Sequence, residues 1–195
     1  MSIFPRRRLI QLALLALPTP FALGHGAAAA TNGKTQMTGK AGSEHDFDFF
    51  LGSWNVHHRR LKKRMVGSDD WEEFEGTTTC QALLGGIVNA NDSVTNRPDG
   101  SYRGLGLRAF DIRTNTWADW YLDARDPLQI DPPGIGRFVD RIGTFLSDDV
   151  FEGKPIKVRG VFSSLSPMVA QWEQAFSADN GVTWESNWVM RYTRM

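Results

Sequence analysis

The sequence of 195 residues contains one cysteine, Cys80, so it cannot form an internal disulfide. It has only four histidines, and its 22 basic residues are matched by 22 acidic ones. This even balance gives no electrostatic reason to expect nucleic acid or an anionic membrane surface as a partner. Stability must come from the core, for which 7 tryptophans and 12 phenylalanines supply apolar area.

Sequence motifs for covalent or metal chemistry are also scarce. The chain has no Gly-x-Ser-x-Gly elbow, no Cys-His nucleophile signature and no glycine-rich phosphate loop. Adjacent histidines on a strand, such as His57 and His58, point in opposite directions and chelate a metal poorly. His45 with Asp46 and Asp48 offers at most a weak cation site. We therefore expect no metal and no cofactor.

The N-terminal residues have the composition of an export signal. Arg6 to Arg8 precede an apolar run over residues 9–23, and small residues at 27–30 suit cleavage. The paired arginines fit a twin-arginine signal, with an ordinary Sec signal as the alternative. No cysteine stands directly after the apolar run, so we expect no lipoprotein anchor and a periplasmic or secreted location.

The rest of the chain predicts one domain. Removal of residues 1–30 leaves 165 residues with a net charge of −3, because three arginines and no acids are lost. Residues 31–43 are rich in Gly, Thr and Lys and are typical of a flexible leader. The folded domain is expected over residues 44–195, and its oligomeric state is left open.

Apolar and polar residues alternate with period two from residue 53 onward, and turn residues interrupt the pattern every eight to twelve residues. This pattern predicts an all-β fold. Hairpin-length connections favour a single up-and-down antiparallel barrel of about ten strands, which also leaves no exposed sheet edge. Three prolines place residues 126–136 in the longest loop, over one mouth of the barrel. The expected strands are 54–61, 71–83, 87–94, 102–111, 117–123, 137–139, 143–151, 156–164, 169–176 and 183–193.

The first strand opens with Gly52-Ser53-Trp54, which resembles the Gly-x-Trp signature of the calycins, the lipocalins and fatty-acid-binding proteins. The resemblance implies that Trp54 closes the barrel floor and that an arginine near the C-terminus packs across its face. Arg191 or Arg194 is the candidate, and of the two we select Arg191. All of these roles are structural.

The chain from residue 44 to residue 194 also resembles a bacterial family of uncharacterised activity. Its members share an FDF-x-LG-x-W opening, a basic first strand, a Trp-Glu-x-Phe-x-Gly second strand and a Trp-Glu-x-Asn-Trp ending. Each motif has its counterpart here, from Phe47 to the segment Trp184–Trp188. The resemblance implies a lipocalin-like barrel and no assigned reaction.

A second turn motif lies near the C-terminus. Residues 177–184 match the Asp-box pattern S-x-D-x-G-x-x-W of sialidase propellers. Asp179 is expected to order the turn, Gly181 to take a positive φ, and Trp184 to pack on the hairpin. A propeller needs repeated blades, and the box occurs once, so we interpret it as a turn.

The most unusual strand segment is His57-His58-Arg59-Arg60. Alternation puts His58 and Arg60 on the face of Trp54, and hence in the lumen if Trp54 points inward. Buried cations need partners, and the second strand offers Glu72, Glu73 and Glu75. The alternative is a solvated hairpin held by weak cross-strand ion pairs.

The best candidate for a pocket rim is the strand 117–123. Alternation places Trp117, Asp119, Tyr121 and Asp123 on one face, and the strand then delivers Arg125 into the proline loop. The alternative is that the aromatic residues fill the core and the charges cap a loop.

These observations favour a barrel that binds a small, partly apolar ligand in its lumen without covalent chemistry. The expected partner is a small amphipathic molecule, with no nucleic acid and no membrane anchor. One alternative is a cofactor-free isomerase, cyclase or hydrolase, with His58 as general base beside Glu73 or Asp123. Another is a barrel filled with side chains that serves as a scaffold. The predicted ligand-binding residues are His58, Arg60, Trp117, Tyr121, Asp123 and Arg125.

Overall fold

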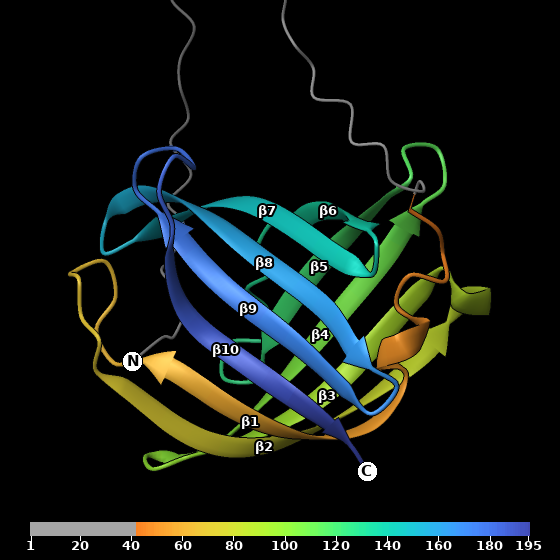
Figure 1. Ribbon diagram of the computed structural model, residues 1–195, viewed down its shortest axis with the longest axis horizontal. Helices are drawn as coiled ribbons and strands as arrows, with labels where there is room; N and C mark the ends of the chain where they lie inside the picture. Colours follow the sequence, from red (N-terminus) through yellow and green to blue (C-terminus); the bar gives the residue numbers. More distant parts are fainter. Residues whose placement is uncertain (1–41) are drawn as a thin grey trace, which may run out of the picture.

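The computed structural model describes residues 42–195, which form one closed antiparallel barrel of ten strands (Figure 1). Each strand pairs with its neighbours in the sequence, and β10 pairs with β1 to close the barrel. The predicted up-and-down topology is therefore confirmed. The strands are β1 (Gly52–Leu61), β2 (Trp71–Leu83), β3 (Val88–Arg97), β4 (Gly100–Asp111), β5 (Thr116–Asp123), β6 (Gly134–Val139), β7 (Ile142–Phe151), β8 (Lys154–Ser166), β9 (Val169–Ser177) and β10 (Glu185–Arg194), with short 3-10 helices η1 (Asp48–Phe50) and η2 (Leu84–Gly86).

The period-two pattern of β1 separates an inner from an outer face. Trp54, Val56, His58 and Arg60 are buried, and the residues between them are exposed. Trp54 therefore does point inward, and its strand carries His58 and Arg60 on the same side. The inner face that the sequence predicted for this strand is confirmed.

One end of the barrel is closed by aromatic side chains. The η1 segment crosses this floor and inserts Phe47 and Phe50, which contact Trp54, Trp117 and the strands opposite. The indole nitrogen of Trp54 donates a hydrogen bond to the Phe50 carbonyl at 2.8 Å. Each fully buried aromatic side chain contributes about 1.5 to 3 kcal/mol through its apolar area, so the floor is a main source of stability.

The arginine that covers Trp54 is Arg194, whose guanidinium carbon lies 4.1 Å from the indole centroid. Its Nη1 and Nη2 donate to the carbonyls of Leu51 and Phe49 at 2.7 and 2.8 Å, which fastens the η1 segment to β10. Arg191 is on the exposed outer face, three residues away. The selection of Arg191 was wrong, because an odd offset along a strand reverses the side of the sheet.

The β9–β10 turn has the geometry that the Asp-box pattern predicts. The Asp179 carboxylate accepts hydrogen bonds from the backbone N–H groups of Val182 and Thr183 at 3.1 and 2.8 Å. Gly181 has φ +92°, and its carbonyl accepts a bond from the Trp184 indole at 3.0 Å. A hydrogen bond from the Thr183 hydroxyl at 2.6 Å, together with the bond from the Thr183 N–H, lowers the pKa of Asp179 to about 2. Because the turn includes residues 183 and 184, β10 begins at Glu185, two residues later than expected.

Strands β5 and β6 form a short ladder. These strands pair only over Trp117–Asp119 and Gly134–Gly136, whereas the β7–β8 ladder runs for ten residue pairs. The segment 124–133, which contains Pro127, Pro132 and Pro133, connects β5 to β6 and contributes to the cavity lining. The proline-rich loop therefore lies over the mouth away from the aromatic floor, as predicted, but it is shorter than the predicted 126–136, because Gly134–Gly136 pair with β5 as the start of β6.

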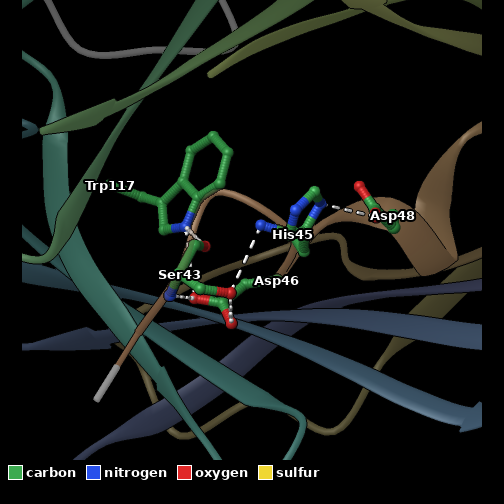
Figure 2. Close-up of polar contacts among 5 residues, drawn as sticks. All are labelled: Ser43, His45, Asp46, Asp48 and Trp117. Atoms are coloured by element: carbon green, nitrogen blue, oxygen red, sulfur yellow. Dashed lines mark hydrogen bonds and ion pairs between the residues drawn. The ribbon is translucent and has the colours of Figure 1, made fainter. Parts of the chain in front are cut away.

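The start of the fold lies slightly earlier than the sequence indicates. Ser43 was assigned to the flexible leader, yet its carbonyl accepts a hydrogen bond from the Trp117 indole at 3.2 Å, and its N–H donates to Asp46 (Figure 2). The predicted signal peptide and residues 31–41 of the leader lie outside the described residues. From residue 42 onward, no helix is both long enough and apolar enough to cross a bilayer.

Candidate ligand-binding cavity

The lumen above the aromatic floor holds a cavity of about 1480 Å³. Its lining runs from Val56 and Tyr192 near the floor to Asp126 and Glu152 in the connections at the other end. A cavity of this size has room for a ligand larger than a typical drug-sized molecule. The alternative of a barrel filled with side chains is therefore wrong.

The cavity has two chemically different walls. Strands β7 to β10 contribute mainly aromatic and aliphatic side chains, and β3 to β5 contribute mainly hydrogen-bonding groups. The difference follows from the inward positions of each strand, which alternate with outward ones along the chain. The apolar wall consists of Phe145, Val158, Phe162, Trp172, Trp188, Met190 and Tyr192, and the polar wall of Asn91, Ser93, Thr95, Arg108, Asp119, Tyr121 and Asp123.

His58 lines this cavity and is only 3% exposed. Its ring stacks on Phe74, and its Nδ1 accepts a hydrogen bond from the Trp188 indole at 3.3 Å. The proton of the neutral ring is thereby assigned to Nε2, which has no hydrogen-bond partner among residues 42–195. Burial, with smaller contributions from His57 and Arg60, lowers the pKa of His58 to about 3. His58 is thus an uncharged donor inside the lumen.

The enzymatic hypothesis requires a carboxylate beside His58, and among residues 42–195 none contacts its ring. Glu73 lies on the outer face with His57 and Arg59, and Asp123 is paired with Arg125. Without an adjacent carboxylate and with so low a pKa, His58 is poorly suited to act as a general base near neutral pH. The proposed pairing of His58 with Glu73 or Asp123 was wrong, because Glu73 alternates to the opposite face of the sheet from the lumen.

Arg60 faces inward but does not line the cavity. Its guanidinium forms an ion pair with Glu72, with Nε at 2.9 Å from Oε1, and lies 5.5 Å from the Phe74 and Trp188 ring centroids. It is buried behind Trp188, at the end of β1 farthest from the floor. The expected ligand contact is therefore corrected: Arg60 packs against Phe74 and Trp188 and does not reach the cavity.

Trp117 is also on the predicted inner face, but along the barrel axis it lies in the floor rather than beside the cavity. It is fully buried in the floor, where its ring meets Phe47 edge-on with centroids 5.0 Å apart. Figure 2 shows its indole nitrogen directed at Ser43. Trp117 does not line the cavity, so the prediction that it contacts a ligand was wrong.

The other three predicted residues, Tyr121, Asp123 and Arg125, do line the cavity. Tyr121 is 46% exposed, and its hydroxyl lies against Gly104, where a Cβ would come within 2.0 Å. Burial raises the pKa of Tyr121 to about 12. Arg125 donates from Nε to Asp123 at 2.9 Å, which lowers the pKa of the Asp123 carboxyl.

Sequence reasoning missed Arg108, which is the central cation of the polar wall and 4% exposed. Its two terminal nitrogens donate to the amide oxygens of Asn89 and Asn91 at 2.8 and 2.7 Å, and its Nε lies 3.2 Å from Asp119. Burial raises the pKa of Asp119, and the adjacent Arg108 opposes that rise. The available signal was the alternation of Gly104, Gly106 and Arg108 on one face of β4.

Residues 42–195 contain no group of three His, Cys, Asp or Glu side chains arranged to hold a metal. His45 and Asp48 form an exposed pair at 3.1 Å, while Asp46 turns away toward Ser43 (Figure 2). The three candidate ligands therefore do not converge on one point.

No family model and no curated protein matches the sequence, so the family resemblance stays a prediction. Among solved structures, the S-type phycobiliprotein lyase CPES from Guillardia theta is similar, with a TM-score of 0.53 and 10% identity over 78% of this chain and 92% of that one. Two further barrels have a TM-score of 0.43. They are EF1p2_mFAP2b bound to DFHBI, with 12% identity over 78% of this chain and 98% of that one, and the redesigned barrel b11L5F_LGL, with 14% identity over 77% and 96%. At these identities the likeness to the lyase shows the fold alone: this chain is a closed antiparallel β-barrel of the up-and-down type.

Proposed function

We propose that this protein is a lipocalin-like carrier that binds a small amphipathic molecule in its lumen. The observation that carries the proposal is the cavity of about 1480 Å³ with one apolar and one polar wall. A ligand with an apolar face and several polar substituents satisfies both walls at once. A purely apolar ligand would leave the polar wall without partners, at a cost for each desolvated group.

The contacts offered by the lumen support this proposal. The apolar wall presents Trp172 and Trp188, whose rings meet edge-on at 6.0 Å and offer flat surfaces for a ligand ring. Opposite them, the side chains of Asn91 and Ser93 are already hydrogen-bonded at 2.9 Å, which holds them in fixed orientations. His58 adds an unpaired Nε2 donor. A preorganised wall of this kind reduces the entropy lost on binding.

A cavity-blocking variant tests the proposal. Val158→Trp places a large side chain in the lumen without removing a hydrogen bond, and it is expected to weaken binding of the neutral dye N-phenyl-1-naphthylamine at least about tenfold, equal to about 1.4 kcal/mol. Dye fluorescence titration measures this. The matched control is Val161→Trp on the same strand, which is outside the cavity lining and is expected to leave affinity unchanged. Equal binding by both variants, or no binding by the parent protein, would contradict the proposal.

Export is part of the same proposal and is supported by the sequence pattern of residues 1–30. Protein purified from the native envelope fraction is expected to begin near residue 31. Denaturing mass spectrometry measures the mature mass directly. An uncleaved chain confined to the cytoplasm would overturn the location and leave the binding proposal intact.

A further inference from the structure

The charged side chains that line the cavity are mostly acidic. The lining contains two arginines, Arg108 and Arg125, and six carboxylates. A concave surface with low-dielectric walls concentrates the field of such charges and raises the local concentration of ligands of opposite sign. The carboxylates are Asp119, Asp123, Asp126, Asp131, Asp149 and Glu152.

Both lining arginines are neutralised by neighbouring carboxylates. Arg108 pairs with Asp119 at 3.2 Å, and Arg125 holds Asp123 through bonds from Nε and Nη2. Neither cation is therefore available to compensate an incoming anion without giving up its own partner. A ligand carboxylate beside Arg108 would also lie next to Asp119, which is unfavourable at short range.

The acidic excess is concentrated at the open end of the cavity. Asp126 and Asp131 lie in the segment 124–133 and Glu152 in the β7–β8 turn, and none of the three forms an ion pair with a described residue. We call these three residues the acidic rim. A ligand that enters the lumen from this end passes them.

Other basic residues near this end do not line the cavity. Arg60 pairs with Glu72, Arg97 lies 3.3 Å from Asp99, and neither lines the cavity. Arg64 is also outside the lining and lies over the ring of Phe176. The acidic rim is thus not balanced by cations inside the cavity.

Two further features, independent of the rim, are compatible with this class of ligand. His58 is more than nine-tenths buried and unpaired at Nε2, so it offers a hydrogen bond to an acceptor on the ligand body, and because it is uncharged it does not repel a cationic group. The faces of Trp172, Trp188 and Tyr192 line the cavity opposite the polar wall. Indole and phenol faces attract cations, by about 0.5 to 2 kcal/mol depending on desolvation.

We propose that the lumen selects a cationic amphiphile, in which an aromatic or otherwise apolar body carries a protonated amine or a fixed ammonium group. This inference rests on the proposed carrier function and specifies its ligand. The apolar body lies against β7 to β10, and the cationic group lies toward the acidic rim.

Three dyes of similar size and different charge test this on the full chain: cationic thioflavin T, neutral N-phenyl-1-naphthylamine and anionic anilinonaphthalene sulfonate. Fluorescence titration at low ionic strength is expected to give an affinity for the cationic dye at least about tenfold above that for the anionic dye. Raising the salt concentration is expected to reduce this difference, because exposed carboxylates are screened.

A charge-removal variant locates the effect. The triple variant Asp126→Asn, Asp131→Asn and Glu152→Gln is expected to weaken cationic dye binding about five- to tenfold and to leave the neutral dye unchanged. All three positions are in connections between strands, so the barrel ladders are untouched. The matched control removes three carboxylates from the outer face, as Glu73→Gln, Glu75→Gln and Asp92→Asn, and is expected to leave both affinities unchanged.

The possible outcomes separate the inference from the function on which it rests. If no dye of any charge binds, the carrier function itself fails. If the neutral or anionic dye binds as tightly as the cationic one, the carrier function stands and charge selection is overturned. An equal loss of cationic binding in the outer-face control also overturns it, because net charge rather than the rim would then be responsible.

Discussion

Replacing Arg108 with Met is expected to lower the free energy of unfolding by about 3 to 5 kcal/mol. Arg108 is buried, and its removal leaves Asp119 without its cation and the Asn91 amide oxygen without its donor, while the Asn89 amide oxygen keeps only the weak Cys80 thiol donor. A buried polar group that loses its partner keeps the cost of its desolvation. Urea unfolding followed by tryptophan fluorescence measures the change.

Two comparisons show whether the loss arises from the broken network. Arg103 is on the same strand as Arg108, β4, but on its exposed outer face, where it pairs with Asp92 of β3 at 2.7 Å. Arg103→Met is expected to lower the free energy of unfolding by less than about 1 kcal/mol. The double variant Arg108→Met with Asp119→Leu removes both charges and is expected to recover part of the loss. A loss for Arg108→Met no greater than that for Arg103→Met would contradict the assigned role.

Lowering the pH from about 6.5 to about 4.5 is expected to reduce the free energy of unfolding by about 2 kcal/mol through His58 alone. Burial lowers its pKa in the folded barrel from 6.5 to about 3. Between these two pH values the unfolded chain is protonated at His58 and the folded chain is not. The stability contributed by the neutral ring is therefore fully present above pH 6.5. It is lost progressively as the pH falls toward 3.

The groups that face His58 do not reverse this sign. Phe74 and Trp188 are uncharged, and Arg60 on the same strand further disfavours a second cation. Asp179 has a lowered pKa, so its contribution is lost only below about pH 4, outside this window. The raised pKa of Asp119 acts in the opposite direction, because the folded state then binds the extra proton.

A variant isolates the contribution of His58. In His58→Phe the pH dependence of the free energy of unfolding between about 6.5 and 4.5 is expected to be flatter than in the parent protein by about 1 kcal/mol per pH unit. Urea unfolding at several pH values measures both slopes, and contributions from other groups cancel in the difference. Parallel slopes would show that His58 is not kept neutral by the fold.

Local sequence pattern was sufficient for the faces of β1 and β5 and for most strand positions, although β6 begins at Gly134 rather than at residue 137. Alternation along β1 placed Trp54, His58 and Arg60 inward, and alternation along β5 put Trp117, Tyr121 and Asp123 on one side. These predictions succeed because side chains on a strand alternate between faces wherever the strand lies in the fold. Turn chemistry is local in the same way, which is why Asp179 and Gly181 have the predicted geometry.

The alternation of residues along a strand does not predict how far along the barrel axis a side chain lies. Trp117 and Tyr121 share a face, but one is sealed in the floor and the other lines the cavity. Arg60 and His58 differ similarly, since only His58 reaches the lumen. Depth depends on the stagger between strands and on which end η1 closes, and both are properties of the assembled sheet.

The sequence by itself therefore determined the all-β class, the turns and the inward or outward side of the strand residues discussed above, because each depends on neighbours along the chain. Only the tertiary structure decided that Arg194 covers Trp54, that Asn89 and Asp119 meet Arg108, and that the lumen has two unlike walls. Contacts of this kind join residues on different strands. They are set by the register of the closed barrel, which no single strand encodes.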